Sequence, residues 1–303
     1  MIDRLEEYEL SRKKLLGLGG GLLGSLLMAP QLAAGASRQV EARLAGGVLT
    51  VAVSGGPDTV DPHTTIAGTD WVSLANVYDG LFMRDYASPA QPARTIPGLA
   101  TSYTVSPNGR AYTFRLRRNV RFHDGTPWNA DAAVFNFRRW FDKSFKYYYP
   151  RANATVKGFI GGVAKWEAVD AYTLRITLTK ANAGWFDYLS GAPTFFMVSP
   201  AAVAKSGNVA FGDSGGGTGA FMVKEYRRKQ RLVLSANPSY WRGRPPVDTV
   251  IITPIPDDAA RAAATLSGQY DVAQELSPDS LQAIKRNSSM AVKFAGSSSP
   301  SCL

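Results

Sequence analysis

The amino-acid sequence predicts a mixed α/β fold of the α+β kind, and three observations support this prediction. Residues 172–178 alternate apolar and polar side chains, as a half-buried strand does. Residues 129–141 carry apolar side chains at helical spacing behind Asn129, a favourable helix cap. Strand-like and helix-like segments follow one another without the strict strand–helix–strand rhythm of a parallel sheet.

The remaining elements are predicted from the alternation typical of strands and the spacing typical of helices. Residues that favour the beginning or the end of an element give its bounds. Strands are expected at residues 48–53, 112–116, 221–226, 231–235 and 249–255. The runs at 221–226 and 231–235 should form a hairpin. Helical spacing covers residues 71–81, and Asp257 should cap a helix that ends at Gly268. The Ser-Pro pair at 277–278 opens a last helix, because proline is favoured in the first turn.

Composition and charge narrow the class of function. The chain has 303 residues and a net charge of +10, but its Lys and Arg residues are scattered. The densest basic cluster, residues 226–231, is predicted to be a hairpin turn, so we expect a basic soluble protein without a nucleic-acid partner. The single cysteine, Cys302, allows no disulfide within the chain. We expect no metal site or cofactor, because His63 and His123 lie far apart in sequence and in no ligand motif.

The N-terminal segment predicts export. Basic residues at 12–14 precede an uncharged apolar stretch over residues 15–36, which ends in Ala-Gly-Ala. We interpret residues 1–36 as a signal peptide, with Sec and Tat export both open and an uncleaved anchor as the alternative. No cysteine lies near the cleavage site, so we expect a periplasmic protein that is not a lipoprotein.

One segment suggests catalysis. The Gly-Asp-Ser-Gly-Gly run at residues 212–216 matches the nucleophile segment of trypsin-like proteases. A serine nucleophile needs a histidine base, and neither His63 nor His123 stands in the sequence context of one. We therefore expect no enzyme, and a secreted serine hydrolase using Ser214 is the alternative.

A run of three tyrosines follows the helix predicted to begin after Asn129. Tyr147, Tyr148 and Tyr149 stand beside the basic residues Lys146 and Arg151. Such aromatic side chains can stack nucleic-acid bases, line a small-molecule cleft or simply pack in a core. The residues alone leave these three roles open.

An ordered set of short segments resembles a known family. Examples are Asn-Val-Tyr-Asp-Gly-Leu-Phe at 76–82 and Asn-Pro-Ser-Tyr-Trp at 237–241. The full set covers residues 49–53, 61–63, 76–82, 97–103, 108–117, 120–127, 218–221, 237–241 and 267–272. In this order the segments resemble the extracytoplasmic solute-binding proteins of family 5, which include the peptide-, dipeptide- and nickel-binding proteins of ABC importers.

The resemblance implies a periplasmic-binding-protein-like fold with two lobes that close on a ligand. The core of the first lobe would comprise residues 37–80 and 186–270, with 81–185 as an inserted subdomain. Residues 271–303 would begin a second lobe that is largely missing, because relatives are considerably longer. The chain would thus be a C-terminally truncated member of the family.

The resemblance also implies a function and a set of ligand contacts. The chain would be the substrate-binding component of an ABC importer, most often for peptides, with nickel or another solute as the alternative. Its partners would be a small ligand and a membrane permease, and the protein itself is expected to be a monomer. One peptide-binding relative carries an acidic residue at the position of Ile66. The implied contacts are Ile66, Ala67, Gly68, Thr69, Tyr147, Tyr149, Thr218 and Gly219.

Overall fold

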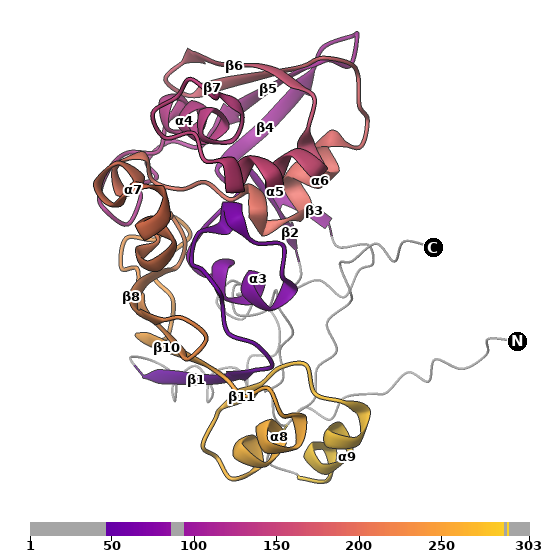
Figure 1. Cartoon of the computed structure of the whole chain (residues 1–303), viewed down its shortest axis with the longest axis vertical. Helices are drawn as coiled ribbons and strands as arrows, with labels where there is room; N and C mark the ends of the chain where they lie inside the picture. Colours follow the sequence, from indigo (N-terminus) through magenta and orange to yellow (C-terminus); the bar gives the residue numbers. More distant parts are fainter. Residues whose placement is uncertain (1–46, 86–93, 288–289, 291–303) are drawn as a thin grey trace, which may run out of the picture.

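The computed structural model describes residues 47–85, 94–287 and 290 (Figure 1). The predicted signal peptide of residues 1–36 and Cys302 lie outside the described residues. Among the described helices, none combines the length and the apolar composition needed to cross a bilayer.

A five-stranded sheet joins segments from both ends of the described chain. Its strands are ordered β11-β1-β10-β9-β8. They comprise β1 (Val48–Val53), β8 (Phe221–Arg227), β9 (Arg231–Ala236), β10 (Thr249–Pro254) and β11 (Val272–Ala273). Strand β1 is parallel to β10 and β11, whereas β8, β9 and β10 are antiparallel neighbours. Because β1 is apolar at nearly every position, it fits an interior place in this sheet, between β11 and β10.

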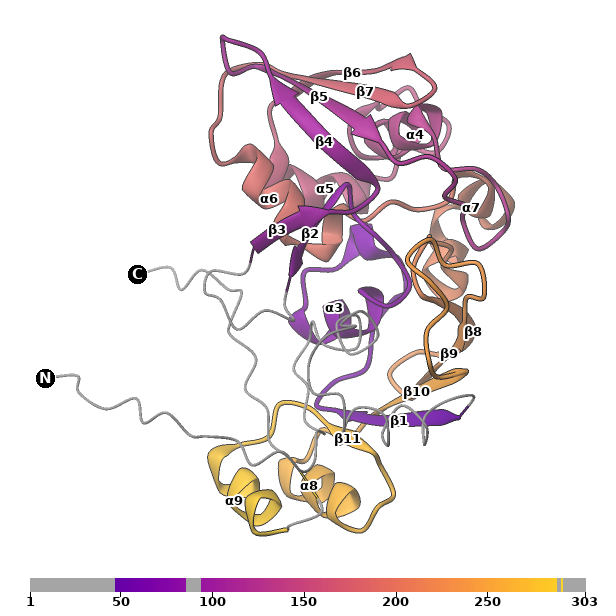
Figure 2. The same ribbon diagram turned by 180° about the vertical axis from the view of Figure 1, so that it is seen from behind.

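A four-stranded antiparallel sheet is built from one continuous part of the chain (Figure 2). Its order is β4-β5-β7-β6, and its strands are β4 (Ala100–Val105), β5 (Ala111–Leu116), β6 (Val163–Asp170) and β7 (Thr173–Leu178). Helix α4 (Ala130–Phe141) packs on β6 and β7, and α5 (Pro150–Ile160) packs on α4. A small ribbon of β2 (Phe82–Asp85) and β3 (Arg94–Pro97) lies between the two sheets (Figure 1).

The other helices connect and cover these sheets. They are η1 (Pro62–Thr64), α3 (Gly68–Leu74), α6 (Trp185–Gly191), η2 (Pro193–Phe195), α7 (Pro200–Ser214), α8 (Asp258–Leu266) and α9 (Pro278–Arg286). Helices α8 and α9 pack against each other at the end of the molecule beyond β1 (Figure 1).

Two apolar clusters form the core, one for each sheet. The first contains Phe114, Trp128, Phe137 and Trp140, and it lies between the four-stranded sheet and its helices. The second contains the inward side chains of β1, β9 and β10 together with Phe211 of α7. Each sheet therefore has its own core, and the segments that connect the sheets carry the polar networks described below.

The structure confirms the mixed α/β class and most of the predicted elements. The predicted helix over residues 71–81 is wrong in its extent, because α3 ends at Leu74. The carbonyls of Asn76 and Val77 instead accept hydrogen bonds from the backbone of Phe221 and Gly219. Pairing with this distant segment replaces the last turns of the helix. The division at residues 80, 185 and 270 stays a prediction, although β11 extends the five-stranded sheet to Ala273.

Candidate functional site

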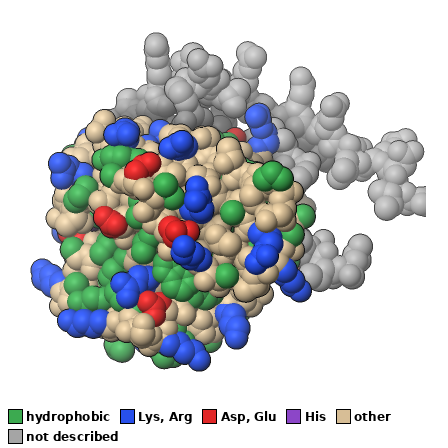
Figure 3. Space-filling view, turned by 90° about the horizontal axis from the view of Figure 1, so that it is seen from above, with side chains coloured by type: hydrophobic (Ala, Val, Ile, Leu, Met, Phe, Trp, Pro, Cys, Tyr) green, Lys and Arg blue, Asp and Glu red, His purple; other side chains and the backbone are tan. Residues whose placement is uncertain are grey.

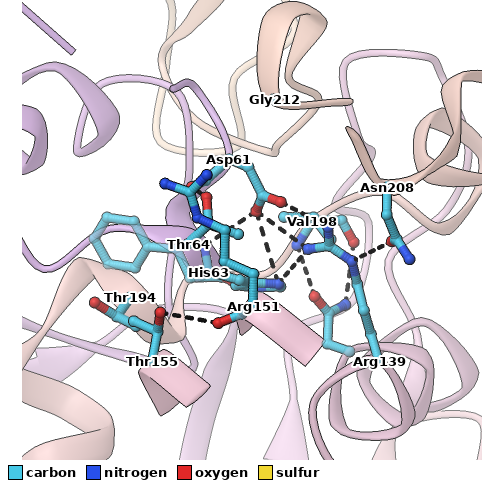
Figure 4. Close-up of polar contacts among 12 residues, drawn as sticks. Asp61, His63, Thr64, Arg139, Arg151, Thr155, Thr194, Val198, Asn208 and Gly212 are labelled. Carbon is cyan, nitrogen blue, oxygen red and sulfur yellow. Dashed lines mark hydrogen bonds and ion pairs between the residues drawn. The ribbon is translucent and has the colours of Figure 1, made fainter. Parts of the chain in front are cut away.

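A buried ion pair lies at the centre of the first polar network (Figure 4). Asp61 precedes η1, and its carboxylate caps this turn by accepting a hydrogen bond from the backbone of His63. The same carboxylate meets the guanidinium of Arg139 in α4 at 2.6 and 3.1 Å. Both side chains are buried, and burial opposes the charge on Asp61. The charge and hydrogen bonds of Arg139 outweigh this effect, so the pKa of Asp61 is lowered.

His63 lies beside the ion pair and contacts Arg139 as a neutral ring. Its Nε2 donates to the carbonyl of Phe196 at 2.7 Å, and its Nδ1 accepts from Arg139 at 2.6 Å. Burial and the neighbouring guanidinium lower the pKa of His63 to about 3. The ring is therefore a positioned acceptor and not a proton carrier at neutral pH.

Asn208 connects this ion pair to the run of tyrosines. Helix α7 is interrupted at Gly207, whose φ of 76° is readily adopted by glycine. The interruption directs Asn208 toward α4, where its Oδ1 accepts from Arg139 Nε at 3.0 Å. Its Nδ2 donates to the carbonyls of Tyr147 and Tyr148, each at 3.2 Å. One amide side chain thus fixes both the guanidinium and the turn at residues 145–150, which carries the three tyrosines and is called the aromatic turn.

The segment at residues 66–68 projects from the same region. Ile66 is 61% exposed, and Ala67 and Gly68 are exposed as well. The segment is held from both sides, because the hydroxyl of Thr65 donates to the carboxylate of Asp70 at 2.6 Å. The backbone N–H of Ala67 in turn donates to that hydroxyl at 3.1 Å. It is therefore a supported, solvent-facing segment.

The eight residues predicted from the resemblance fall into three groups in the structure. Ile66, Ala67 and Gly68 form the exposed segment, while Thr69 lies in α3 with its side chain outside the described part. Tyr147 and Tyr149 are half-buried on the aromatic turn, and the Arg139 guanidinium lies 5.2 Å from the Tyr149 ring. The network of Asp61, Arg139 and Asn208 connects the segment that leads into the first group with the backbone of the second. Their contact with a ligand stays a prediction.

The third group, Thr218 and Gly219, belongs to a second polar network centred on Asp79. Thr218 is fully buried and donates to the Asp79 carboxylate at 2.8 Å. Tyr240 and Trp241 donate to the same carboxylate at 3.1 and 2.9 Å. A Cβ on Gly219 would stand 2.5 Å from the backbone carbon of Val77, so only glycine fits there. These positions favour a scaffold role for both residues over ligand contact.

Sequence reasoning did not single out Arg139 or Asn208. A signal was present for Arg139, because it occupies the buried face of α4 together with Ala132 and Asn136. A charged residue on an apolar helix face predicts a buried partner. Asn208 gave no comparable signal, because its role depends on the break at Gly207 in a helix that the sequence did not predict.

The alternative of a serine hydrolase finds no support in the geometry. Ser214 is the last residue of α7, and its hydroxyl contacts the Ala210 carbonyl and the Ser206 hydroxyl. His63 faces Arg139 and Phe196, and His123 faces the backbone of Gly217 and Gly219. Within the described residues, no cluster of three or more His, Cys, Asp or Glu side chains is arranged to hold a metal ion.

Several curated proteins are similar to this chain. Heme-binding protein A of Haemophilus influenzae is 35% identical over 193 residues, covering 58% of this chain and 35% of that protein. Glutathione-binding protein GsiB of Escherichia coli K12 is 29% identical over 79% of this chain and 44% of that protein. Di/tripeptide-binding protein 1 of Pseudomonas aeruginosa is 29% identical over 77% of this chain and 45% of its own length. The chain thus spans less than half the length of these relatives.

Solved structures and a family model agree with these similarities. The periplasmic binding protein DppA from Helicobacter pylori, in complex with peptide STSA, superposes with a TM-score of 0.72 at 26% identity. The match covers 82% of this chain and 51% of DppA, and it confirms the periplasmic-binding-protein-like fold. The family model described as bacterial extracellular solute-binding proteins, family 5 Middle, matches residues 94–302. The chain therefore belongs to the family 5 bacterial extracellular solute-binding proteins.

Proposed function

We propose that this chain is the ligand-binding component of an ABC importer that captures peptides or similarly small solutes in the periplasm. The family assignment supports a binding protein, and such a protein performs no chemistry on its ligand. The curated relatives are named for binding di- and tripeptides, glutathione and heme, and one similar structure holds the peptide STSA. With glutathione counted as a tripeptide, peptides are the most frequent ligand among these names, so they are our first choice.

The observation that carries the proposal is the connection between the exposed segment and the aromatic turn. Asp61 lies just before the exposed segment at residues 66–68, and it is ion-paired with Arg139. Arg139 in turn is fixed by Asn208, which also holds the carbonyls of Tyr147 and Tyr148. The segment that leads into residues 66–68 and the turn that carries the tyrosines are therefore held by one buried network. Such pre-organised support reduces the ordering cost of binding.

The side chains of these surfaces suit a ligand with an apolar part. Ile66 offers an exposed alkyl side chain, and Tyr147 and Tyr149 offer ring faces with polar ends. Ile66 cannot provide the charge that an acidic residue would provide for a ligand's amino group. In the proposed mechanism the ligand contacts this lobe first, and a second lobe then closes over it by hinge motion.

Thermal unfolding of the purified chain in the presence of candidate ligands tests the proposal. The panel contains di- and tripeptides, glutathione and heme, together with two ligands bound in similar solved structures, the opine mannopinic acid and a nickel–histidine complex. We expect a peptide to raise the Tm, because a ligand that binds only the folded state stabilises it. Stabilisation by heme, an opine or the nickel complex alone would overturn the peptide assignment, and stabilisation by none of them would overturn the binding role.

A pair of matched variants connects the result to the proposed surface. Ile66→Ala removes most of the exposed alkyl side chain and should weaken binding of the stabilising ligand about tenfold, because the apolar contact is lost. Val209→Ala introduces a matched truncation at a valine that is 77% exposed on α7, and it should leave binding unchanged. Equal effects of the two variants would contradict the assignment of residues 66–68 to the ligand.

A further inference from the structure

A groove with an excess of positive charge lies on the four-stranded sheet, apart from the candidate site. It has a volume of about 700 Å³ and runs along the ends of β5 and β7. Its charged side chains are Arg115, Arg117, Arg118 and Asp170, so three arginines face one aspartate and leave a surplus of two positive charges. Figure 3 views this end of the molecule from above and shows many Lys and Arg side chains with fewer Asp and Glu.

Two arginines of the groove are positioned by backbone and aromatic contacts. Arg117 donates from Nε to the Gly98 carbonyl at 2.9 Å, and its guanidinium stacks on the Trp241 ring at 4.3 Å. Arg118 stacks on the Tyr172 ring at 4.2 Å. Within the part of the chain that the structure describes, neither Arg117 nor Arg118 forms an ion pair.

The third arginine has one weak counter-charge. Arg115 donates to the Thr173 hydroxyl at 2.7 Å and lies 3.9 Å from the Asp170 carboxylate. Both charged side chains are largely exposed, so this ion pair contributes little. Burial lowers the pKa of Arg117, and the nearby charge of Arg242 adds to this effect while the Asp79 carboxylate opposes it. The groove therefore offers several guanidinium donors whose charge an anion would balance.

We propose that this groove binds a small anion that carries at least two carboxylate or phosphate groups. Guanidinium groups recognise both kinds of oxyanion through paired hydrogen bonds. A volume near 700 Å³ falls in the range of small-molecule sites, which favours a compact anion over a macromolecule. Two threonines line the same groove and help to position Arg115, because the hydroxyl of Thr101 donates to its carbonyl and the hydroxyl of Thr173 accepts from its guanidinium. This inference stands apart from the proposed function, because it uses none of the residues of the candidate ligand site.

Isothermal titration of the chain with pyrophosphate, citrate and acetate at low ionic strength tests the inference. We expect pyrophosphate or citrate to bind, with an affinity that falls as salt is added, and acetate not to bind measurably. Binding of pyrophosphate alone would identify a phosphate ligand, and binding of citrate alone would identify a polycarboxylate. Failure of both anions to bind would overturn the inference.

Two variants with the same loss of charge separate a defined site from general attraction. Arg115→Gln with Arg118→Gln removes two exposed guanidinium groups from the groove and should weaken binding at least about tenfold. Lys224→Gln with Arg231→Gln removes two exposed charges from β8 and β9 and should leave the affinity unchanged. Equal weakening in the two variants would show general charge attraction and would overturn the site. Circular dichroism and Tm confirm that each variant is folded.

Discussion

Two buried aspartates, Asp61 and Asp79, are each only 1% exposed, yet their charges are compensated in different ways. Asp61 is ion-paired with the guanidinium of Arg139. Asp79 accepts instead from three neutral donors, the side chains of Thr218, Tyr240 and Trp241. A buried ion pair is costly to break from one side, because the remaining charge is left without compensation. Loss of one of several neutral donors costs about as much as one hydrogen bond to a charged group.

The two networks also join different parts of the molecule. The Asp61 network connects the segment before residues 66–68 with α4, α7 and the aromatic turn. The Asp79 network connects the segment that follows α3 with the residues just before β8 and with the segment after β9. We infer that the first network holds the candidate ligand surface and that the second holds the scaffold beneath it.

The largest expected effect is on stability when the ion pair is broken. Arg139→Gln should lower the free energy of unfolding by about 3–5 kcal/mol, because it leaves the Asp61 carboxylate buried without its cation. Thr218→Val removes one neutral donor from Asp79 and should cost less, about 1.5–3 kcal/mol. Urea unfolding at pH 7 measures both values.

A neighbouring residue provides the control for this prediction. Arg138 is partly exposed in the same helix and pairs with Asp142 at 2.9 Å. Because an exposed ion pair contributes little, Arg138→Gln should cost less than about 1 kcal/mol. If Arg139→Gln were no more destabilising than Arg138→Gln or Thr218→Val, the distinction between the two networks would be wrong.

The next effect is an acid sensitivity that originates in the Asp61 network. The pKa of His63 is about 3 in the folded protein, against an ordinary value of 6.5. The folded protein therefore takes up this proton only at a lower pH than the unfolded chain does. The stability contributed by neutral His63 is complete above pH 6.5 and is lost as the pH falls toward 3, by at most about 1.4 kcal/mol per pH unit. Unfolding free energies measured between pH 7 and 4.5 should therefore decline.

Two histidine variants assign this decline to its source. Burial also lowers the pKa of His123, so its contribution has the same sign. His63→Gln should make the slope between pH 6.5 and 4.5 shallower, and His123→Gln should leave the His63 part of the slope in place. An unchanged slope in His63→Gln would contradict the buried neutral state of this ring.

Short-range features of the fold could be predicted from the sequence. The side chain of Asn129 accepts from the Ala132 backbone at 2.9 Å, as expected of a helix cap. The pairing of β8 with β9 is likewise a local hairpin. Such features depend on neighbouring residues only, and the sequence shows those residues directly.

Long-range contacts explain what could not be predicted. The end of α3 is set by backbone pairing between residues 76–77 and 219–221, which propensity does not reveal. The partner of Arg139 lies in a segment that comes well before α4 in sequence. The resemblance named the exposed segment and the aromatic turn as ligand contacts, but the network that joins them emerged only from the structure. Thr218 and Gly219, named together with them, are buried in the other network.

Hydrogen-exchange mass spectrometry on Asn208→Ala tests the central claim most directly. The claim is that one network couples the segment at residues 61–70 to the aromatic turn at 145–150, separately from the Asp79 network. We predict faster exchange in both of these segments, with unchanged exchange at residues 76–82 and 237–241, because Asn208 contacts only the first network. Faster exchange in only one of the two coupled segments, or an equal increase in all four, would contradict the claim.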